Sequence, residues 1–355
     1  MATRRTAART AVTDCCAGPV DDRAFRAAAL EAIRPALPFD GYVWVLTDPS
    51  SSVGVSPLAY IPGLDMQQLP DIIRAKYATS VNRWTTMPTG ACAGLAATTG
   101  GELERSALWR VAARELPLVD ILSAVLRDRY GCWGFVDLWR TNGAPFRDDD
   151  ATFLGSLLDE LTAAQRSRVA HMFQPGPSAG DDRGPALVLL DDNLRPVTET
   201  AAAEQSLRRL LPTDPHDAPI PAAALNVAAQ LLAAEQRIDS SPPRARMHSH
   251  HGAWVTLQAA RLRPSNPTIA ASIAVTIDSI GLADRVDVFN RAHGLTKREA
   301  DVVVELSRGN STRQIAQRLG LSEYTVQDHL KAIFAKSRTS SRAELIARAS
   351  GTAAT

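Results

Sequence analysis

Residues 294–350 read GLTKREADVVVELSRGNSTRQIAQRLGLSEYTVQDHLKAIFAKSRTSSRAELIARAS, and this stretch decides the fold of the C-terminal part of the chain. Its capping residues alone divide it into four helices, because a side-chain oxygen at the start of a helix accepts a hydrogen bond from the first turn. The four starts are Thr296, Ser311 or Thr312, Ser322 and Ser341. Glu299, three residues after Thr296, completes a capping box. The segment is therefore predicted to be all-helical.

Apolar residues recur at helical spacing and give each of these helices one inward face. They are Val302, Val303 and Leu306 in the first helix, Ile315, Ala316 and Leu319 in the second, Val326, Leu330, Ile333 and Phe334 in the third, and Leu345 and Ile346 in the fourth. Gly320 and Leu321 leave only a tight turn between the second and third helices, which predicts a helix-turn-helix. In such a unit the later helix enters the DNA major groove and presents its exposed face to base edges.

The exposed face of this later helix carries Tyr324, Thr325, Gln327, Asp328 and Lys331. The amide of Gln327 can pair with adenine, the carboxylate of Asp328 can accept from cytosine, and the ammonium of Lys331 can reach guanine or phosphate. Helical spacing of this kind also fits an ordinary three-helix bundle, so the pattern by itself leaves both interpretations open.

The motifs of this segment resemble those of the LuxR-type DNA-binding domain. The matching residues are Leu295, Thr296, Arg298 and Glu299 at the opening, Ile315, Ala316 and Leu319 in the scaffold helix, Ser322, Thr325, Val326, His329 and Leu330 in the recognition helix, and Ser341 to Leu345 at the close. They span about 60 of the 355 residues. Two positions depart from the family pattern. Gln327 stands where many members have Lys or Arg, and Lys336 to Thr339 replace the usual K-L-G-V.

The resemblance implies two classes of DNA contact. The expected base readers are Gln327, Asp328 and Lys331, and the expected backbone contacts are Lys297, Arg313, Ser322, Thr325 and Arg342. A solvated helix face or an ion pair within the domain is the alternative role of Arg313 and Arg342. The resemblance further implies that the last helix pairs two copies of the domain on a palindromic site, which makes the chain a homodimer on double-stranded DNA.

Charge is distributed unevenly along the chain. Residues 290–349 contain eleven Lys and Arg against six Asp and Glu, a net charge of +5, and the whole chain carries +1, which leaves −4 for the remainder. A basic module on a mildly acidic body is expected when one domain contacts phosphates and the others do not.

The upstream sequence predicts two further domains. Residues 1–20 are polar and poor in large apolar side chains, which predicts a disordered tail. Residues 21–172 read as helix, antiparallel strands and helix, an α+β domain, and residues 173–183 have the Pro, Gly and Asp content of a linker. Residues 184–282 predict a smaller α+β domain, and residues 288–351 hold the all-α, tetrahelical helix-turn-helix domain. The chain is thus expected to be multidomain.

The two upstream domains resemble a GAF-like and a PAS-like sensory domain, in the order found in a group of large actinobacterial LuxR-type regulators. The resemblance rests on SVNRWTTM (80–87), RDRYGCWGFVDLWR (127–140) and HGAWVTLQAARL (251–262). It implies a one-component transcription regulator in which an unknown small-molecule or protein effector changes DNA affinity. Similarity of fold names no ligand.

The strand CWGFVDLWR (132–140) supplies a candidate ligand pocket. Its alternation places Trp133, Phe135, Asp137 and Trp139 on one face. An aromatic face with one carboxylate suits a flat or cationic ligand. An ordinary core with a surface salt bridge is the alternative.

Several other classes lack their required residues. No lysine lies between Lys76 and Lys297, which excludes a phosphoacceptor receiver domain at LVLLDDN (187–193), since that domain needs a lysine beside its phosphoryl group. No phosphate loop, nucleophile elbow or H-E-x-x-H occurs, so no enzyme is expected. His248, His250 and His251 have no carboxylate or cysteine at ligand spacing and predict a hairpin loop, so no metal and no cofactor are expected.

The chain is expected to be cytoplasmic and to make no membrane contact. It has no apolar run of about 18 residues and no secretion signal, and its four cysteines lack paired-ligand spacing. Two rival interpretations stay open. One is a protein-interaction adaptor whose helix-turn-helix has lost DNA affinity, and the other is a sensor that carries haem or flavin.

Overall fold

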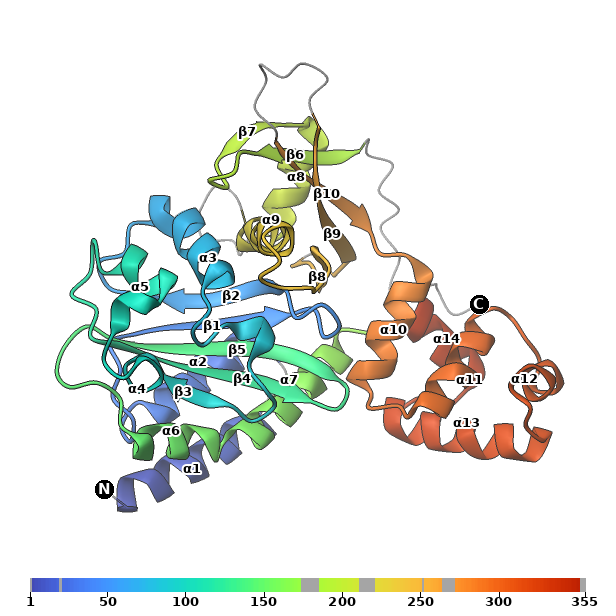
Figure 1. The fold of residues 1–355 in the computed structure, drawn as a ribbon. Coiled ribbons are helices and arrows are strands. Elements are labelled where there is room, and N and C mark those ends of the chain that lie inside the picture. Colours follow the sequence, from blue (N-terminus) through green and yellow to red (C-terminus); the bar gives the residue numbers. More distant parts are fainter. Residues whose placement is uncertain are drawn as a thin grey trace. The chain divides into compact units, whose positions relative to one another are not determined.

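The computed structural model describes residues 2–18, 21–173, 185–210, 221–250, 252–263 and 272–351 (Figure 1). The chain divides into two compact units. The first comprises residues 1–165, 183–251 and 255–278, and the second comprises residues 166–182, 252–254 and 279–355. No helix among the described residues has the length and apolar character that crossing a membrane requires.

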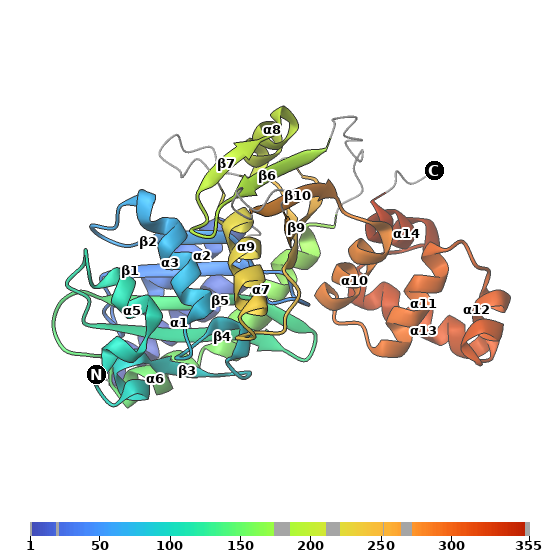
Figure 2. The ribbon, with the colours of Figure 1, turned by 45° about the horizontal axis from the view of Figure 1, so that its top comes forward.

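The first unit contains two antiparallel sheets, each with five strands in the described residues (Figures 1 and 2). The first sheet has the order β2-β1-β5-β4-β3. Its strands are β1 (Gly41–Thr47), β2 (Gly54–Tyr60), β3 (Cys92–Gly94), β4 (Asp120–Asp128) and β5 (Gly131–Arg140). Val136 of the central strand β5 lies opposite Trp44 of β1 and Ala124 of β4. The side chains of β5 are buried on both faces of the sheet.

Helices cover both faces of this sheet (Figure 2). One face, which includes Val136 and Leu138, packs on α1 (Ala2–Ala17), α2 (Asp22–Ile33), α6 (Asp148–Gly155) and α7 (Leu158–His171). The other face, which includes Ile121 and Trp139, packs on α3 (Leu69–Ala78), α4 (Leu95–Thr99) and α5 (Ala107–Ala112). Short 3-10 turns lie at Met66–Gln68, Trp84–Thr86 and Leu103–Arg105.

Residues 2–17 form helix α1, so the prediction of a disordered tail over residues 1–20 is wrong for this stretch. Ala8 and Val12, one turn apart, are buried in the core on that face of the sheet. Arg5 pairs with Asp150 of α6 at 3.4 Å. The buried face of α1 consists of small residues, and sequence patterns detect a buried face mainly by its large apolar side chains.

The second sheet repeats the strand order of the first. Its order is β7-β6-β10-β9-β8, which matches β2-β1-β5-β4-β3 when each sheet is counted from its own first strand. The strands are β6 (Ala186–Leu190), β7 (Pro196–Glu199), β8 (Arg244–His248), β9 (Trp254–Arg261) and β10 (Ile273–Ser279). In both sheets helices occupy the connection between the second and third strands: α3 in the first, and α8 (Ala201–Leu210) and α9 (Ala222–Glu235) in the second.

The two sheets of the first unit share one apolar core. Residues of the buried helix α9 pack in the same cluster as Val55 of β2 and Ile73 and Tyr77 of α3 (Figure 2). Gly54 stands at the closest approach, since a Cβ there would lie 2.8 Å from Asn226 Nδ2. Instead, Asn226 donates a hydrogen bond of 3.0 Å to the Gly54 carbonyl. The two upstream modules therefore fold against each other.

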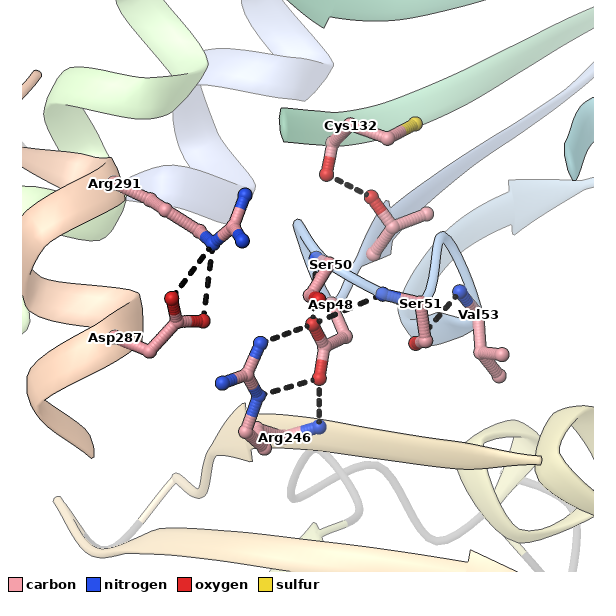
Figure 3. A network of polar contacts seen from close by, with 9 residues as sticks. Asp48, Ser50, Ser51, Val53, Cys132, Arg246, Asp287 and Arg291 are labelled. Carbon is pink, nitrogen blue, oxygen red and sulfur yellow. Dashed lines mark hydrogen bonds and ion pairs between the residues drawn. The ribbon is translucent and has the colours of Figure 1, made fainter. Parts of the chain in front are cut away.

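A buried ion pair also joins the two sheets (Figure 3). Asp48 follows β1, and Arg246 lies in β8. Asp48 Oδ2 accepts from the backbone N of Arg246 at 2.8 Å and from its Nε at 2.7 Å, and Oδ1 accepts from Nη2 at 2.7 Å. Oδ1 also accepts from the backbone N of Ser50 at 2.8 Å. Asp48 is 2% exposed and Arg246 is 5% exposed, so this ion pair is shielded from water.

Helices make up most of the described part of the second unit. After the end of α7 come α10 (Leu282–Ala292), α11 (Lys297–Ser307), α12 (Thr312–Leu319), α13 (Glu323–Ser337) and α14 (Arg342–Ser350). The predicted helix starts are confirmed, since the side chains of Thr296, Ser311, Ser322 and Ser341 each accept from the backbone N–H three residues later. The predicted domain start at residue 288 lies inside α10.

Aromatic side chains from three stretches of the chain meet in the second unit. Phe173, two residues beyond α7, stacks on Trp254 with ring centroids 4.7 Å apart. It also meets Phe289 of α10 edge-on at 5.3 Å. His293 lies 4.3 Å from the Phe289 ring, and burial lowers the pKa of His293 to about 4. Phe173 was expected in a linker, but it is a buried part of this core. The other linker residues, 174–183, lie outside the described residues.

Candidate nucleic-acid interface

Helices α12 and α13 form the predicted helix-turn-helix. Gly320 ends α12 in the left-handed conformation, with φ +65°, and donates its N–H to the Ala316 carbonyl. Glycine adopts this conformation at little cost because it has no Cβ. Two residues later, Ser322 begins α13 by accepting the Thr325 N–H at 3.0 Å. Local hydrogen bonds therefore fix both ends of the turn.

The predicted inward faces form the core of this domain. The apolar residues of α11, α12 and α13 that are at most 5% exposed are Val302, Val303, Leu306, Ile315, Ala316, Val326, Leu330 and Ile333. Leu345 of α14 is buried as well, whereas Leu319, Phe334 and Ile346 are only half-buried. The opposite face of α13 does not take part in this core.

The departure at Lys336 to Thr339 is accommodated by local contacts. Lys336 Nζ lies 2.6 Å from Glu299 Oε2. Burial by itself would raise the pKa of Glu299. The hydrogen bonds from Lys336 and Thr296 lower it by more than this, so the pKa of Glu299 lies below its usual value. Arg338 takes the left-handed conformation, φ +52°, where the family pattern has glycine, and this costs about 1 kcal/mol more than glycine would. The recognition helix is thus anchored to the start of α11.

The three expected base readers lie on the exposed face of α13. Gln327, Asp328 and Lys331 are all exposed. Lys331 Nζ lies 3.2 Å from Asp328 Oδ1, so these two charges neutralise each other in the absence of DNA. Gln327 Nε2 donates a long hydrogen bond of 3.5 Å to the Thr312 hydroxyl.

The expected backbone contacts occupy helix starts. Lys297 and Arg313 are exposed in the first turns of α11 and α12. The hydroxyls of Ser322 and Thr325 lie 2.9 Å apart at the start of α13. Arg342 is half-buried, and its Nη2 donates to the same Thr312 hydroxyl that Gln327 contacts, at 3.1 Å. Arg342 therefore has a hydrogen bond within the domain, to a hydroxyl rather than to the acidic partner of the ion pair given as its alternative role.

The four candidate pocket residues lie in β5. Trp133, Phe135, Asp137 and Trp139 are each at most 1% exposed. Trp133 Nε1 donates to Asp128 at 3.0 Å, Phe135 stacks on Trp84 at 5.1 Å, and Trp139 packs beside α3 and α5. Their surroundings thus differ along the strand, and only Asp137 brings a charge to this face.

Asp137 belongs to a buried polar cluster that sequence reasoning missed. Lys76 Nζ of α3 lies 2.9 Å from Asp137 Oδ2. Ser123 Oγ and Trp84 Nε1 donate to Asp137 Oδ1 at 2.6 and 3.0 Å. Burial lowers the pKa of Lys76, and its Nζ also lies 4.5 Å from the Trp84 ring centroid. The available signal was the position of Lys76 one helical turn after Ile72, on the buried side of α3.

Comparison with known proteins identifies the C-terminal helices. Residues 293–349 match the family model described as bacterial regulatory proteins, luxR family. A stretch of 56 residues is 45% identical to the transcriptional activator protein ExaE of Pseudomonas putida, and it covers 16% of this chain and 26% of that protein. The match thus spans about a quarter of the relative's length. The C-terminal part of the chain is a LuxR-type helix-turn-helix domain, as its motifs predicted.

Two solved structures are also similar by comparison of coordinates. The VqmA dimer of Vibrio cholerae, described in connection with LuxR-type receptors, is 17% identical, with 47% of this chain and 82% of that chain covered and a TM-score of 0.20. The phage VqmA–DPO complex is 19% identical, with 51% and 86% covered and a TM-score of 0.19. TM-scores this low do not establish a shared fold.

Proposed function

We propose that this chain, with a LuxR-type helix-turn-helix as its C-terminal domain, is a transcription regulator that binds double-stranded DNA in a sequence-specific manner. The observation that carries the proposal is the two-sided character of α13. One side is buried through Val326, Leu330 and Ile333, and the other side exposes the base readers. A helix with these two sides fits the major groove while remaining attached to its domain.

The proposed contacts fall into two classes. In the groove the Asp328–Lys331 pair separates, so that Asp328 accepts from a cytosine amino group and Lys331 reaches guanine, while Gln327 pairs with adenine. Lys297, Arg313 and Arg342 contact phosphates, and Ser322 and Thr325 do so at the start of α13, where free N–H groups favour an anion. Phosphate contacts set affinity and register, whereas base contacts set sequence preference.

We further propose that the first unit is a sensory body with GAF-like and PAS-like modules, that the chain acts in the cytoplasm, and that two copies bind one DNA site. The repeated strand order of the two sheets supports two related modules. Their shared core and the Asp48–Arg246 pair support a body in which a change at one sheet is transmitted to the other.

The DNA-binding proposal is tested with the full chain on a duplex selected from a random library. Affinity should fall by orders of magnitude between about 50 and 200 mM salt, because bound phosphates release counterions. Arg313→Ala should weaken all duplexes about equally and reduce the salt slope by about one unit. Gln327→Ala should instead lose roughly 1–3 kcal/mol of discrimination at one base pair.

The matched control is Arg4→Ala, which removes an exposed arginine of α1 outside the C-terminal domain and should leave the salt slope unchanged. If the folded wild-type chain binds no duplex at low salt, the protein-interaction adaptor is the better interpretation. If Gln327→Ala weakens every duplex equally, Gln327 is not a base reader.

The sensory proposal predicts reciprocal coupling. An effector that changes DNA affinity must bind more tightly or more weakly in the presence of DNA by the same factor, typically about 5–150-fold. The measurement titrates the full chain with its selected duplex in the presence of metabolite fractions, and then titrates the active fraction with and without duplex. Unchanged DNA affinity across all fractions and cell extracts would mean that the body only assembles the regulator.

A further inference from the structure

Tyr324 is the most exposed large hydrophobic side chain in the described part of the chain. It is 75% exposed, whereas the next, Val197 and Tyr60, are 58% and 56% exposed. Among the described residues its hydroxyl has no hydrogen-bond partner. Most of the ring is thus left outside the core of its own domain, and exposed aromatic surface of this size is unfavourable in water.

Tyr324 is the second residue of α13, within the first turn that Ser322 caps. Helical periodicity places Tyr324 on the same stripe as Asp328, four residues later, and Lys331, seven residues later. The rise of an α-helix, about 1.5 Å per residue, separates Tyr324 from Asp328 by about 6 Å along the axis. Tyr324 therefore extends the proposed base-reading stripe by one turn toward the start of the helix.

The charges around Tyr324 distinguish a base from a phosphate as its partner. Tyr324 offers no positive charge to a phosphate, and its exposed neighbour Glu323 is acidic, whereas the phosphate contacts proposed for this turn are made by the hydroxyls of Ser322 and Thr325. The charges of Asp328 and Lys331 are matched to each other at 3.2 Å. The ring of Tyr324 is thus the one large apolar surface on this stripe. The apolar group that base edges present in the major groove is the C5-methyl of thymine.

We propose that Tyr324 is a specificity-determining residue that packs its ring on a thymine C5-methyl group at one edge of the bound half-site. This inference rests on the proposed DNA-binding function. Tyr324 would recognise a methyl group, whereas Gln327, Asp328 and Lys331 would recognise hydrogen-bonding groups of the bases. The ring carries the contact, and the hydroxyl is dispensable.

The test replaces each thymine of the selected duplex, one at a time, with deoxyuridine, which lacks the methyl group and keeps the same hydrogen-bonding edge. At one position of each half-site the full wild-type chain should lose about fourfold in affinity, the effect of one buried methyl group. Tyr324→Ala should bind the thymine duplex more weakly by at least this factor and should not distinguish thymine from deoxyuridine there. Tyr324→Phe should behave as wild type.

The control variant is Tyr60→Ala, which removes another exposed tyrosine and should keep the wild-type response. Circular dichroism should show Tyr324→Ala to be folded, since the side chain is 75% exposed. The inference is overturned, with the DNA-binding function intact, if no thymine of the half-site responds, if Tyr324→Ala responds as wild type does, or if Tyr324→Ala weakens every duplex equally. Failure of the wild-type chain to bind any duplex overturns both.

Discussion

Replacing Asp48 with alanine should lower the free energy of unfolding of the first unit by about 3–5 kcal/mol, the cost of breaking a buried ion pair by removing one of its members. The Arg246 guanidinium would lose the carboxylate that accepts from its Nε and Nη2. The turn after β1 would also lose the acceptor for the Ser50 N–H. Because the two sheets still share one apolar core, both should unfold together in the variant.

Urea unfolding followed by tryptophan fluorescence measures this loss, because Trp44, Trp84, Trp109, Trp133 and Trp139 all lie in the first unit. The matched control is Glu204→Ala, which breaks the exposed pair with Arg208 in α8. Such surface pairs contribute at most about 1 kcal/mol. A loss from Asp48→Ala no larger than that of the control would mean that the two sheets do not depend on this pair.

Replacing Asp137 with asparagine should also lower the free energy of unfolding by about 3–5 kcal/mol, because the Lys76 ammonium would then be buried beside a neutral group. Asparagine keeps an acceptor for Ser123 and Trp84, so the loss isolates the charge. Adding Lys76→Met removes the uncompensated charge and should restore most of the stability. Together with Lys76→Met alone, these two variants form a double-mutant cycle on one contact of 2.9 Å.

The Asp137→Asn variant should become more stable as the pH rises. Burial already lowers the pKa of Lys76, and without the carboxylate it falls further below the value in the unfolded chain, about 10.4. Between the pKa of Lys76 in the folded variant and its pKa in the unfolded chain, the unfolded chain binds more protons than the folded one. The free energy of unfolding therefore rises with pH until the pKa of the unfolded chain is reached. A flat pH dependence, or no recovery in the double variant, would show that Lys76 is solvated in the variant.

Any effector that binds at Asp137 must displace this ion pair.

The C-terminal domain was predictable because its decisive signals are local. Thr296 and Glu299 lie three residues apart, and their capping box forms as the sequence indicates. Gly320 marks the turn by its conformational freedom, and Ser322 marks the next helix start by its hydroxyl. The motif resemblance added the function that helical spacing alone leaves open.

The features that the sequence did not reveal depend on distant partners. Arg246 is 198 residues from Asp48, and Lys76 is 61 residues from Asp137, so no spacing rule connects either pair. Strand β8 reads RARMH and shows no alternation of apolar and polar residues. Arg246 is polar yet buried in an ion pair, so the sequence pattern does not reveal the buried face of this strand. Helix α1 was missed for a related reason, since Ala8 contributes to a core only through close packing.

The aromatic cluster of the second unit has a consequence for modularity. The chain enters this unit in three separate stretches, and Phe173 and Trp254 come from the two earlier ones. A fragment cut at residue 293, where the match to the DNA-binding family begins, would keep His293 but lose Phe289, Phe173 and Trp254, the rings of this cluster. Transplanting this DNA reader onto another protein therefore means grafting a discontinuous surface, and recombination at a single point in the gene would not carry the whole unit with it.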